Sequence, residues 1–243
     1  MEFKNKIVLI TGASKGIGAE TAKLFAKVGA TVIINYSESD ELAQKVLEDV
    51  KKYSDGMIIK CDVTDENKVK EMINKIMGTY SKIDILVNNV GGYLEGDEWD
   101  GDSKLWKESL DLNIISTLNV SKYVSQKFIE SKSGIIVNLA SRYARMGHFD
   151  TITYAASKAA ILNITQAYSK LLSPFGRANS VSPGAADAGY WKTAPKEELE
   201  AVKSQSPHKK LISPKQIAET IIFLSSEKSK MINGQDLLVD GGK

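Results

Sequence analysis

Short apolar runs alternate with amphipathic stretches along most of the chain. The runs are rich in β-branched residues and have the length of buried strands; they are IVLI (7–10), TVIINY (31–36), GMIIKCDV (56–63), IDILVNN (83–89), GIIVNLAS (134–141) and QDLLVD (235–240), with RANSVSP (177–183) as a weaker candidate. Between them, apolar residues recur with helical period. In residues 19–29, Ala22, Phe25 and Ala26 share one face, and we expect Gly29 to be the C-cap.

This alternation predicts an α/β fold. Strands that alternate with helices form a parallel sheet, with right-handed crossovers that place helices on both faces. We therefore expect residues 1–243 to form one Rossmann-fold domain, doubly wound around a mostly parallel seven-stranded sheet. Two stretches interrupt the pattern, residues 90–103 and 184–207, and each follows a strand candidate. Long insertions there are typical of ligand-binding loops, and we expect residues 184–207 to form a substrate lid.

Composition narrows the possible partners. The chain has 243 residues, of which 42% are hydrophobic and 26% charged, so it can bury the core of one domain. The formal net charge of +2 is too small to indicate a nucleic-acid partner. With one cysteine (Cys61), no apolar leader and no apolar run long enough to span a bilayer, we expect a cytoplasmic protein without membrane association. We expect no metal site.

TGASKGIG (11–18) follows the first predicted strand and opens the first predicted helix. The glycines Gly12, Gly16 and Gly18 have the spacing G-x-x-x-G-x-G, which differs from the G-x-G-x-x-G dinucleotide fingerprint but has the same context. Glycines here let backbone N–H groups approach a pyrophosphate at the positive end of a helix. By itself the motif is equally consistent with a structural turn between strand and helix. It is not a Walker A loop, because no Gly-Lys-Ser/Thr run closes it.

YAASK (154–158) places Tyr154 and Lys158 one helical turn apart on the same face. Ser141 lies thirteen residues before Tyr154, at the carboxyl end of a predicted strand. The chain has a second Tyr-x-x-x-Lys at Tyr123 and Lys127, but the corresponding upstream position is a leucine, so we interpret that pair as surface residues of a long helix.

Together these motifs resemble the short-chain dehydrogenase/reductase family. The resemblance spans nearly the whole chain and rests on TGASKGIG (11–18), CDVTD (61–65), NNVGG (88–92), Asn113, Ser141, Tyr154, Lys158, Asn179, Pro183 with Gly184, and VDGG (239–242). It implies a nicotinamide-dependent oxidoreductase that acts on a ketone or a secondary alcohol. It also implies a homotetramer built on two long helices, at about residues 105–130 and 152–172.

The resemblance implies a role for each site residue. Tyr154 would transfer the proton, Ser141 would hold the substrate oxygen, Lys158 would bind the nicotinamide ribose, and Asn113 would hold a water that relays protons. A tyrosine has an ordinary pKa of about 10, and we expect Lys158 to lower it. Cofactor contacts are implied for Gly12, Ser14, Lys15, Gly16, Ile17, Gly18, Tyr36, Ser37, Asp62, Val63, Asn89, Gly91, Tyr154, Lys158, Pro183 and Gly184. Taken singly, each catalytic residue also has a structural interpretation, such as a helix kink or cap for Asn113.

The end of the second predicted strand indicates which nicotinamide cofactor is preferred. An acidic residue at its end would bind a ribose 2′-OH and repel a 2′-phosphate, but the resemblance puts Tyr36 and Ser37 there, and Lys15 where a basic residue pairs with that phosphate. We expect NADP(H) to be preferred over NAD(H), with Glu38 or Asp40 as ribose partners if the expectation fails. Ala188 stands where the family commonly has a threonine that contacts the nicotinamide.

The substrate is less defined. The resemblance includes 3-oxoacyl-[acyl-carrier-protein] reductases and glucose dehydrogenases. An acidic carrier protein would be repelled by the acidic residues of the first insertion, which are Glu95, Asp97, Glu98, Asp100 and Asp102, whereas Arg142 and Arg145 could face a phosphate or carboxylate. A sugar or polyol dehydrogenase is the alternative within the family. A cofactor-binding sensor without turnover is the alternative outside enzymes, although such a protein would more naturally have lost a catalytic residue.

Overall fold

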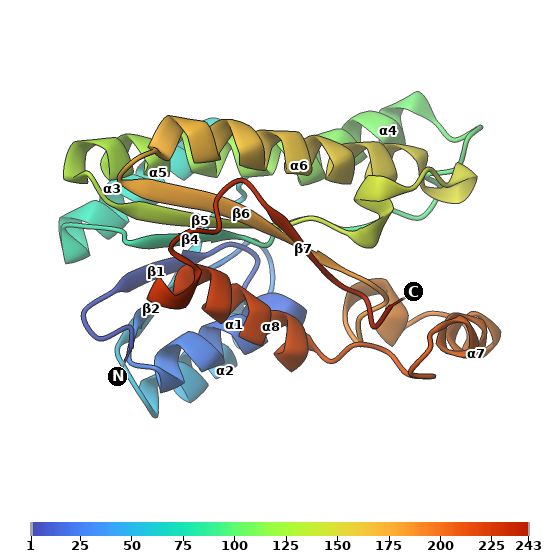
Figure 1. The fold of residues 1–243 in the computed structure, drawn as a ribbon, viewed down its shortest axis with the longest axis horizontal. Coiled ribbons are helices and arrows are strands. Elements are labelled where there is room, and N and C mark those ends of the chain that lie inside the picture. The colour runs from blue at the N-terminus through green and yellow to red at the C-terminus, as the bar shows by residue number, and fades with distance from the viewer. Residues whose placement is uncertain (1, 243) are drawn as a thin grey trace.

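The computed structural model describes residues 2–242 as one sheet between two layers of helices (Figure 1). The strands are β1 (Ile7–Ile10), β2 (Thr31–Tyr36), β3 (Gly56–Lys60), β4 (Ile85–Asn88), β5 (Gly134–Leu139), β6 (Gly176–Pro183) and β7 (Asp236–Val239). They pair in the order β3-β2-β1-β4-β5-β6-β7, and every pairing is parallel. The predicted doubly wound, seven-stranded sheet is confirmed, including its weakest strand, β6.

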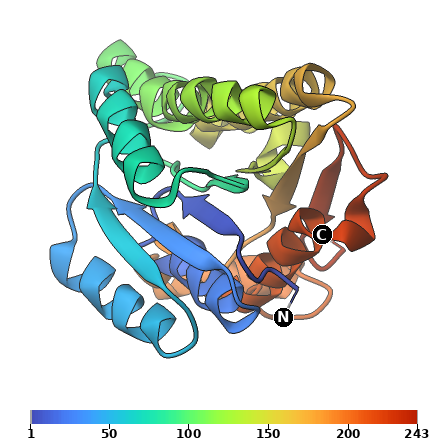
Figure 2. The same cartoon turned by 90° about the vertical axis from the view of Figure 1, so that its left-hand side faces the viewer.

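Helices cover both faces of the sheet, as expected when strands are joined by right-handed crossovers. The helices are α1 (Gly16–Lys27), α2 (Asp40–Lys51), α3 (Glu66–Tyr80), α4 (Ser103–Leu110), α5 (Ser116–Ser131), α6 (Ile152–Leu172), α7 (Lys196–Gln205) and α8 (Pro214–Ser225). Helices α1, α2 and α8 lie on one face, and α3, α5 and α6 lie on the other (Figures 1 and 2). The N-terminus and the carboxyl ends of the strands lie at opposite ends of the molecule.

The two faces of the sheet carry separate apolar layers. Val8 and Ile10 of β1 pack with Phe25 of α1, while Leu9 of the same strand points to the opposite layer with Phe128 of α5. Because both faces are covered, a strand such as β1 (IVLI) is apolar at successive positions and does not alternate with polar residues. This double burial explains why the strands were recognisable as short continuous apolar runs.

Several boundaries differ from the predicted ones. β3 ends at Lys60 and not at residue 63, because the chain turns where the Asp62 carboxylate accepts a hydrogen bond from the Thr64 N–H at 3.0 Å. Helix α1 begins at Gly16, and its C-cap is Val28; Gly29 follows the cap, with φ +96°. A left-handed residue just beyond the cap is the common way in which a helix ends.

Both insertions project beyond the carboxyl ends of the strands. Residues 184–207 contain a 3-10 turn (Gly189–Lys192) and α7, which lies far from the sheet in Figure 1, and their expected role as a substrate lid stays a prediction. The helix expected at about 105–130 is divided into α4 and α5 by a π-helical turn at Asp111–Ile115. Across residues 2–242, no helix is both long and apolar enough to cross a membrane.

Candidate active site

The predicted catalytic residues come from three segments at the carboxyl ends of β4 and β5. Ser141 follows β5 and is buried, Asn113 lies in the π turn between α4 and α5, and Tyr154 and Lys158 lie in the first two turns of α6. Single π turns often occur at functional sites, since they displace one side chain from the regular helical position. The fold therefore collects residues that are up to 45 positions apart in sequence at one end of the sheet.

Gly91 shows how closely these groups approach one another. Its φ is +140°, and a Cβ added there would lie 2.6 Å from Asn113 Oδ1 and 2.8 Å from Lys158 Nζ. The Asn113 side chain accepts a hydrogen bond from Gly92 N–H at 3.0 Å and donates to Gly92 O at 3.0 Å. It also donates to Ser109 O at 2.9 Å. The amide of Asn113 thus ties the chain after β4 to the π turn, and its expected role in holding a water stays a prediction.

Lys158 is buried, with 3% of its surface exposed, and its Nζ donates to the backbone oxygen of Leu139 at 3.1 Å. Its ammonium lies 5.7 Å from the centre of the Tyr154 ring. Burial lowers the pKa of Lys158 to about 8, because an ammonium without a carboxylate partner is costly away from water. The strand that leads to Ser141 therefore also anchors the lysine.

The pKa of Tyr154 corrects one expectation. Burial raises it above its ordinary value, and the hydrogen bond with Ser141 only partly offsets this. Lys158 is not among the groups that lower the pKa of Tyr154. Both shifts have the sign that burial imposes on an acid and a base, because each side chain is driven towards its neutral form.

The glycine loop fits a pyrophosphate. Gly12 and Gly16 have φ near +60°, a conformation that L side chains rarely adopt. A Cβ on Gly18 would lie 2.6 Å from Asn89 Nδ2 and 2.7 Å from Gly12 O, so this position admits only glycine. Helix α1 has no acidic residue in its first turn and no side-chain cap, which leaves its N–H groups available to an anion. Ser14 and Ile17 belong to the same turn.

Buried polar side chains support this loop from behind, and sequence reasoning missed two of them. Thr11 Oγ1 accepts hydrogen bonds from the N–H groups of Asn89 and Val90, at 2.9 and 3.2 Å. Asn35, inside β2, accepts from Gly12 N–H at 3.3 Å and donates to Cys61 O at 2.9 Å. The available signal was the presence of Thr and Asn within or beside otherwise apolar strands, since a buried amide must find partners.

The end of β2 carries an exposed Ser37 and a buried Tyr36. The Tyr36 hydroxyl donates to Asp40 Oδ1 at 2.7 Å, and Lys60 Nζ lies 2.8 Å from Asp40 Oδ2. Both contacts hold the pKa of Asp40 below its ordinary value, with the lysine contributing more. Of the two acidic residues considered as ribose partners, Asp40 is therefore already engaged.

The remaining predicted cofactor residues border the same edge. Asp62 is exposed and Val63 buried in the turn after β3, and Pro183 ends β6. Gly184 N–H donates to Val239 O at 2.9 Å, which fixes the start of residues 184–207 against β7. Ala188 then lies next to the glycine loop, 3.4 Å from where a Cβ on Gly16 would be. The glycine loop and the segment that follows β6, both expected to contact the cofactor, thus lie close together.

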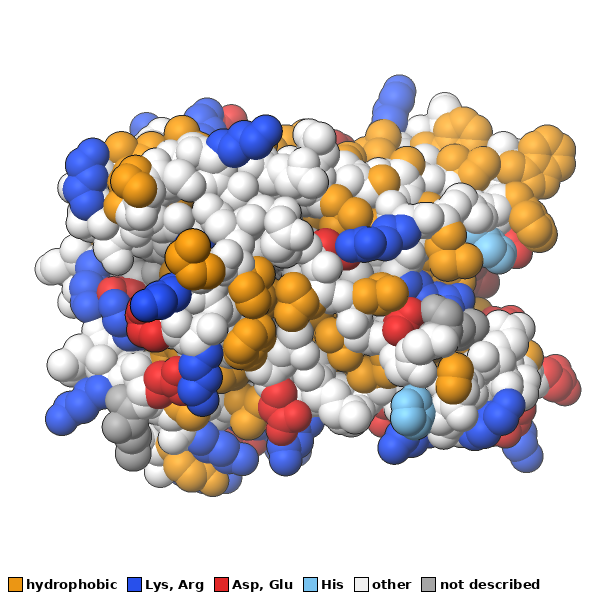
Figure 3. Space-filling model, in the orientation of Figure 1, with side chains coloured by type: hydrophobic (Ala, Val, Ile, Leu, Met, Phe, Trp, Pro, Cys, Tyr) orange, Lys and Arg blue, Asp and Glu red, His pale blue; other side chains and the backbone are white. Residues whose placement is uncertain are grey.

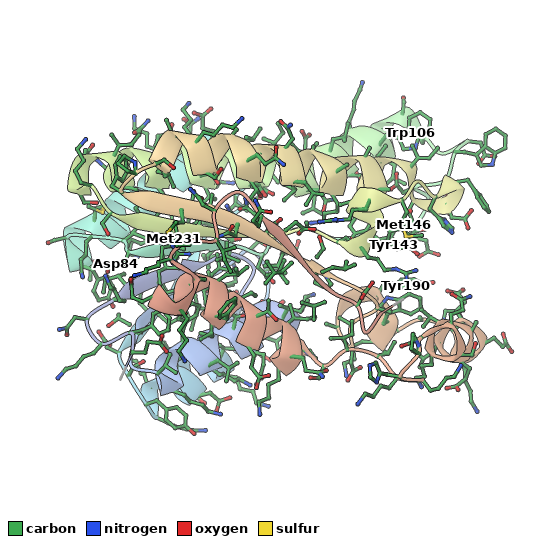
Figure 4. All side chains as sticks on the ribbon, viewed as in Figure 1. Asp84, Trp106, Tyr143, Met146, Tyr190 and Met231 are labelled. Atoms are coloured by element: carbon green, nitrogen blue, oxygen red, sulfur yellow. The ribbon has the colours of Figure 1, made fainter. Side chains whose placement is uncertain are left out.

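Aromatic side chains surround the space beyond Tyr154. The ring of Tyr143 lies 6.3 Å from that of Tyr154 and 5.6 Å from that of His148, both edge to face. Tyr93 of the first insertion and Tyr190 of the second meet edge to face at 5.6 Å. Figure 4 shows Tyr143, Met146 and Tyr190 at one end of the molecule and Asp84 and Met231 at the other. The two insertions therefore contact each other through side chains at the same end of the molecule as Tyr143.

Part of this aromatic surface faces solvent. Trp99, Met146, Phe149 and Ile152 are between 41% and 65% exposed. In Figure 3, hydrophobic side chains gather at the upper right, at the end where Figure 1 places α4 and the start of α6.

The Glu198 carboxylate accepts a hydrogen bond from the Tyr190 hydroxyl at 2.5 Å and raises the pKa of Tyr190 to about 12.

Two charged groups differ from their predicted settings. Asp97 is fully buried, so the first insertion presents fewer acidic side chains to solvent than its sequence indicates. Arg145 is paired with Asp236 at 2.9 Å and is not free for a substrate anion.

The second tyrosine–lysine pair lies on α5, where the Tyr123 hydroxyl donates to Glu66 at 2.9 Å and Lys127 pairs with Glu130. Within residues 2–242, no cluster of three His, Cys, Asp or Glu side chains could hold a metal.

Comparisons with known proteins agree with this geometry. Residues 12–243 match the family model described as Enoyl-(Acyl carrier protein) reductase. The chain is 32% identical to 3-oxoacyl-[acyl-carrier-protein] reductase FabG of Thermotoga maritima over 248 residues, covering 100% of this chain and 99% of that protein. Two solved structures are similar at 27% identity. NAD+-bound xylitol dehydrogenase has a TM-score of 0.93, with 100% of both chains covered. The 3-oxoacyl-[acyl-carrier protein] reductase of Brucella melitensis has a TM-score of 0.91, covering 99% of this chain and 92% of that one.

Proposed function

The chain belongs to the short-chain dehydrogenase/reductase family of nicotinamide-dependent oxidoreductases, and on that premise we propose that it reduces a ketone to a secondary alcohol with NADPH. The observation that carries the proposal is the convergence of Ser141, Tyr154 and Lys158 beside Gly91 and the glycine loop. Carbonyl reduction needs a hydride for the carbon and a proton for the oxygen.

The chain supplies all but the hydride. A bound nicotinamide cofactor provides that hydride when reduced and accepts one when oxidised. The Ser141 hydroxyl, already hydrogen-bonded to Tyr154, holds the substrate oxygen beside the phenol. Tyr154 donates the proton from its hydroxyl, and Lys158, anchored on Leu139 O, holds its ammonium beside the tyrosine ring and next to Gly91. Burial of these groups excludes water and strengthens each of their electrostatic interactions.

The charges around the glycine loop favour a 2′-phosphate. A groove of about 360 Å³ beside the start of α1 is lined by Ser14, Lys15 and Gly16, by the lysines Lys23, Lys45 and Lys192, and by the acidic residues Glu20, Asp49 and Asp187. Lys23 pairs with Asp49, and Lys192 with Asp187, whereas no ion pair within residues 2–242 includes Lys15 or Lys45. Asp40 is held by Tyr36 and Lys60, so of the two acidic residues considered as ribose partners only Glu38 makes no ion pair among the described residues.

Two substrate classes have support. The similarity to 3-oxoacyl-[acyl-carrier-protein] reductases favours a 3-oxoacyl thioester, and the burial of Asp97 takes one carboxylate of the first insertion away from the surface that an acidic carrier would approach. The similarity to xylitol dehydrogenase favours a polyol or sugar. The aromatic rings of Tyr93, Tyr143 and Tyr190 suit that class too, since their hydroxyls and faces contact polyhydroxylated chains.

Cofactor absorbance with purified protein tests the proposal. NADPH and NADH are compared with acetoacetyl-CoA and with crotonyl-CoA, and NADP+ and NAD+ with xylitol, glucose and simple secondary alcohols. Faster oxidation of NADPH than NADH with acetoacetyl-CoA supports the 3-oxoacyl assignment, and turnover with crotonyl-CoA alone would replace it with reduction of a C=C bond. Activity with polyols alone moves the substrate to that class. Equal use of both cofactors would contradict the NADP(H) preference.

The expected oligomeric state and cellular location both stay predictions. The homotetramer implied by the resemblance can be measured by light scattering, and the cytoplasmic location by fractionation. A sensor without turnover, the alternative outside enzymes, would bind NADPH tightly but oxidise none of these substrates. The complete set of Ser141, Tyr154 and Lys158 supports an enzyme.

A further inference from the structure

Asp97 differs from every other acidic residue of its loop. Glu95, Asp100 and Asp102 are exposed and Glu98 is partly so, whereas none of Asp97 is accessible to solvent. None of the ion pairs among residues 2–242 includes Asp97. A buried carboxylate without a cation is costly unless several donors surround it, so its surroundings must supply those donors.

The first turn of α6 supplies them. Asp97 Oδ2 accepts a hydrogen bond from the N–H of Tyr154 at 2.7 Å. Its Oδ1 accepts from Thr153 N–H at 3.2 Å and from the Thr153 hydroxyl. The backbone oxygen of Asp97 accepts from Ile152 N–H at 3.0 Å. These are the first three N–H groups of the helix, which have no partner within it, and a carboxylate there also faces the positive end of the helix dipole.

The sequence next to α6 does not provide this cap. Thr151 occupies the N-cap position but makes no side-chain capping bond, and its hydroxyl is buried without a partner. The cap comes instead from a loop 56 and 57 positions upstream. One of its bonds ends on the backbone of Tyr154 itself.

We propose that Asp97 is a positioning residue that holds Tyr154 in place for proton transfer, an inference that rests on the proposed function. Ser141 is placed by the end of β5, and Lys158 is anchored separately on Leu139 O. Of the three residues, Tyr154 is the one whose position depends on how α6 begins. The hydrogen bonds of Asp97 fix the start of α6. The same loop carries Tyr93, which contacts the lid residue Tyr190. Asp97 therefore couples the loop that covers the substrate to the group that protonates it.

An ordinary cap would stabilise the fold without serving catalysis, and Asp102 offers a matched control. It lies in the same loop, and its side chain caps α4 by accepting from Lys104 N–H at 2.8 Å. We expect Asp97→Asn to lower kcat about tenfold to a hundredfold, because small displacements of reacting groups have effects of this size. The Kd for NADPH should stay within about twofold. Asp102→Asn should leave kcat within about twofold, and an equal loss in both variants would overturn the proposal.

A double-mutant cycle separates positioning from general damage. If Asp97 acts through the Tyr154 hydroxyl, Asp97→Asn has little further effect on the residual turnover of Tyr154→Phe. The same fold loss in both backgrounds would show that Asp97 acts elsewhere. If Asp97→Asn does not fold, Thr153→Val replaces it, since it keeps the shape and removes one donor to Asp97; we expect a kcat loss of about twofold to fivefold. An unchanged kcat in that variant would count against the proposal.

A measurement that does not depend on turnover tests the positioning of Tyr154 separately from the proposed function. With 3-fluorotyrosine placed at position 154, the 19F NMR signal reports the surroundings of that ring. Asp97→Asn should shift or broaden the signal, and Asp102→Asn should not. If the unmodified chain turns over no substrate, the proposed function fails while this comparison still tests the positioning. An unmoved signal in Asp97→Asn would reject the positioning role.

Discussion

The two sides of the site are built in different ways. On the glycine-loop side (residues 11–18 with the strands behind them), contacts are made by backbone atoms and by amide side chains such as the buried Asn35 and the partly buried Asn89. On the outer-loop side (residues 90–103, 142–151 and 184–207), contacts are made between side chains, as at Tyr93 and Tyr190. One methyl group on Gly18 would collide with backbone, whereas an exposed ring can change with little effect on the sheet. The first side is suited to one constant ligand, and the second to specificity that varies.

The largest effect should come from Tyr154→Phe, where the two sides meet. The ring remains but the proton donor is lost, so we expect turnover to fall by about a hundredfold to ten-thousandfold, the usual contribution of a general acid. NADPH binding, measured by fluorescence, should change little, because the glycine-loop side is untouched. Tyr123→Phe, at the second tyrosine–lysine pair, is the control and should keep full turnover. A small change in Tyr154→Phe would mean that another group supplies the proton.

Gly18→Ala tests whether the glycine-loop side tolerates any side chain. The new Cβ would be 2.6 Å from Asn89 Nδ2 and 2.7 Å from Gly12 O, so we expect at least tenfold weaker NADPH binding and about 1 to 3 kcal/mol lower stability. The control is Gly78→Ala in α3, where nothing lies within 4 Å of the added atom. That change should raise stability by about 0.5 to 1 kcal/mol, since alanine favours a helix. Similar results for both variants would remove the steric argument.

Lys158 gives a stability effect with a defined pH dependence. Its pKa is about 8 in the folded chain and has an ordinary value of 10.5 in the unfolded one, so the unfolded chain binds more protons between these values. Stability then rises as pH increases from about 8 to 10.5, and below pH 8 the folded chain bears the full cost of the buried charge. Lys158→Met should therefore be about 1 to 3 kcal/mol more stable at pH 7, although inactive.

Thermal unfolding of both proteins from pH 7 to pH 10 measures this. The difference in Tm should narrow as the pH rises, because the wild-type lysine loses its proton while methionine has none. A constant difference over this range would mean that the cost does not arise from the ionisation of Lys158.

The smallest effect on activity should come from the outer-loop side. Tyr93→Leu removes the edge-to-face contact with Tyr190, which is worth about 0.5 to 1.5 kcal/mol. We expect the substrate KM to rise about twofold to tenfold, with the Kd for NADPH unchanged. Tyr53→Leu, at an exposed tyrosine distant from the insertions, controls for the loss of a ring. A weaker NADPH affinity in Tyr93→Leu would show that the two sides are not independent.

The same contrast explains what the sequence could predict. The strands β1 and β2 were predicted with their observed ends because their two faces are buried, and the glycine loop because its backbone needs glycine at φ near +60°. The burial of Asp97 could not be predicted, since its partners lie 56 and 57 residues away and an aspartate in a polar loop carries no sign of its orientation. The π turn around Asn113 was likewise hidden, because a single such turn is too short to change the helical pattern on either side of it.

The long separation between Asp97 and α6 also bears on how the molecule matures. A helix that received its cap from the preceding residue could complete its first turn as soon as it was synthesised. Here the turn that carries Tyr154 receives its cap only when residues 90–103 have docked against it, and this contact between distant parts of the chain costs loop-closure entropy. A chain in which this loop has not docked therefore contains Ser141, Tyr154 and Lys158 but lacks the hydrogen bonds that hold the start of α6.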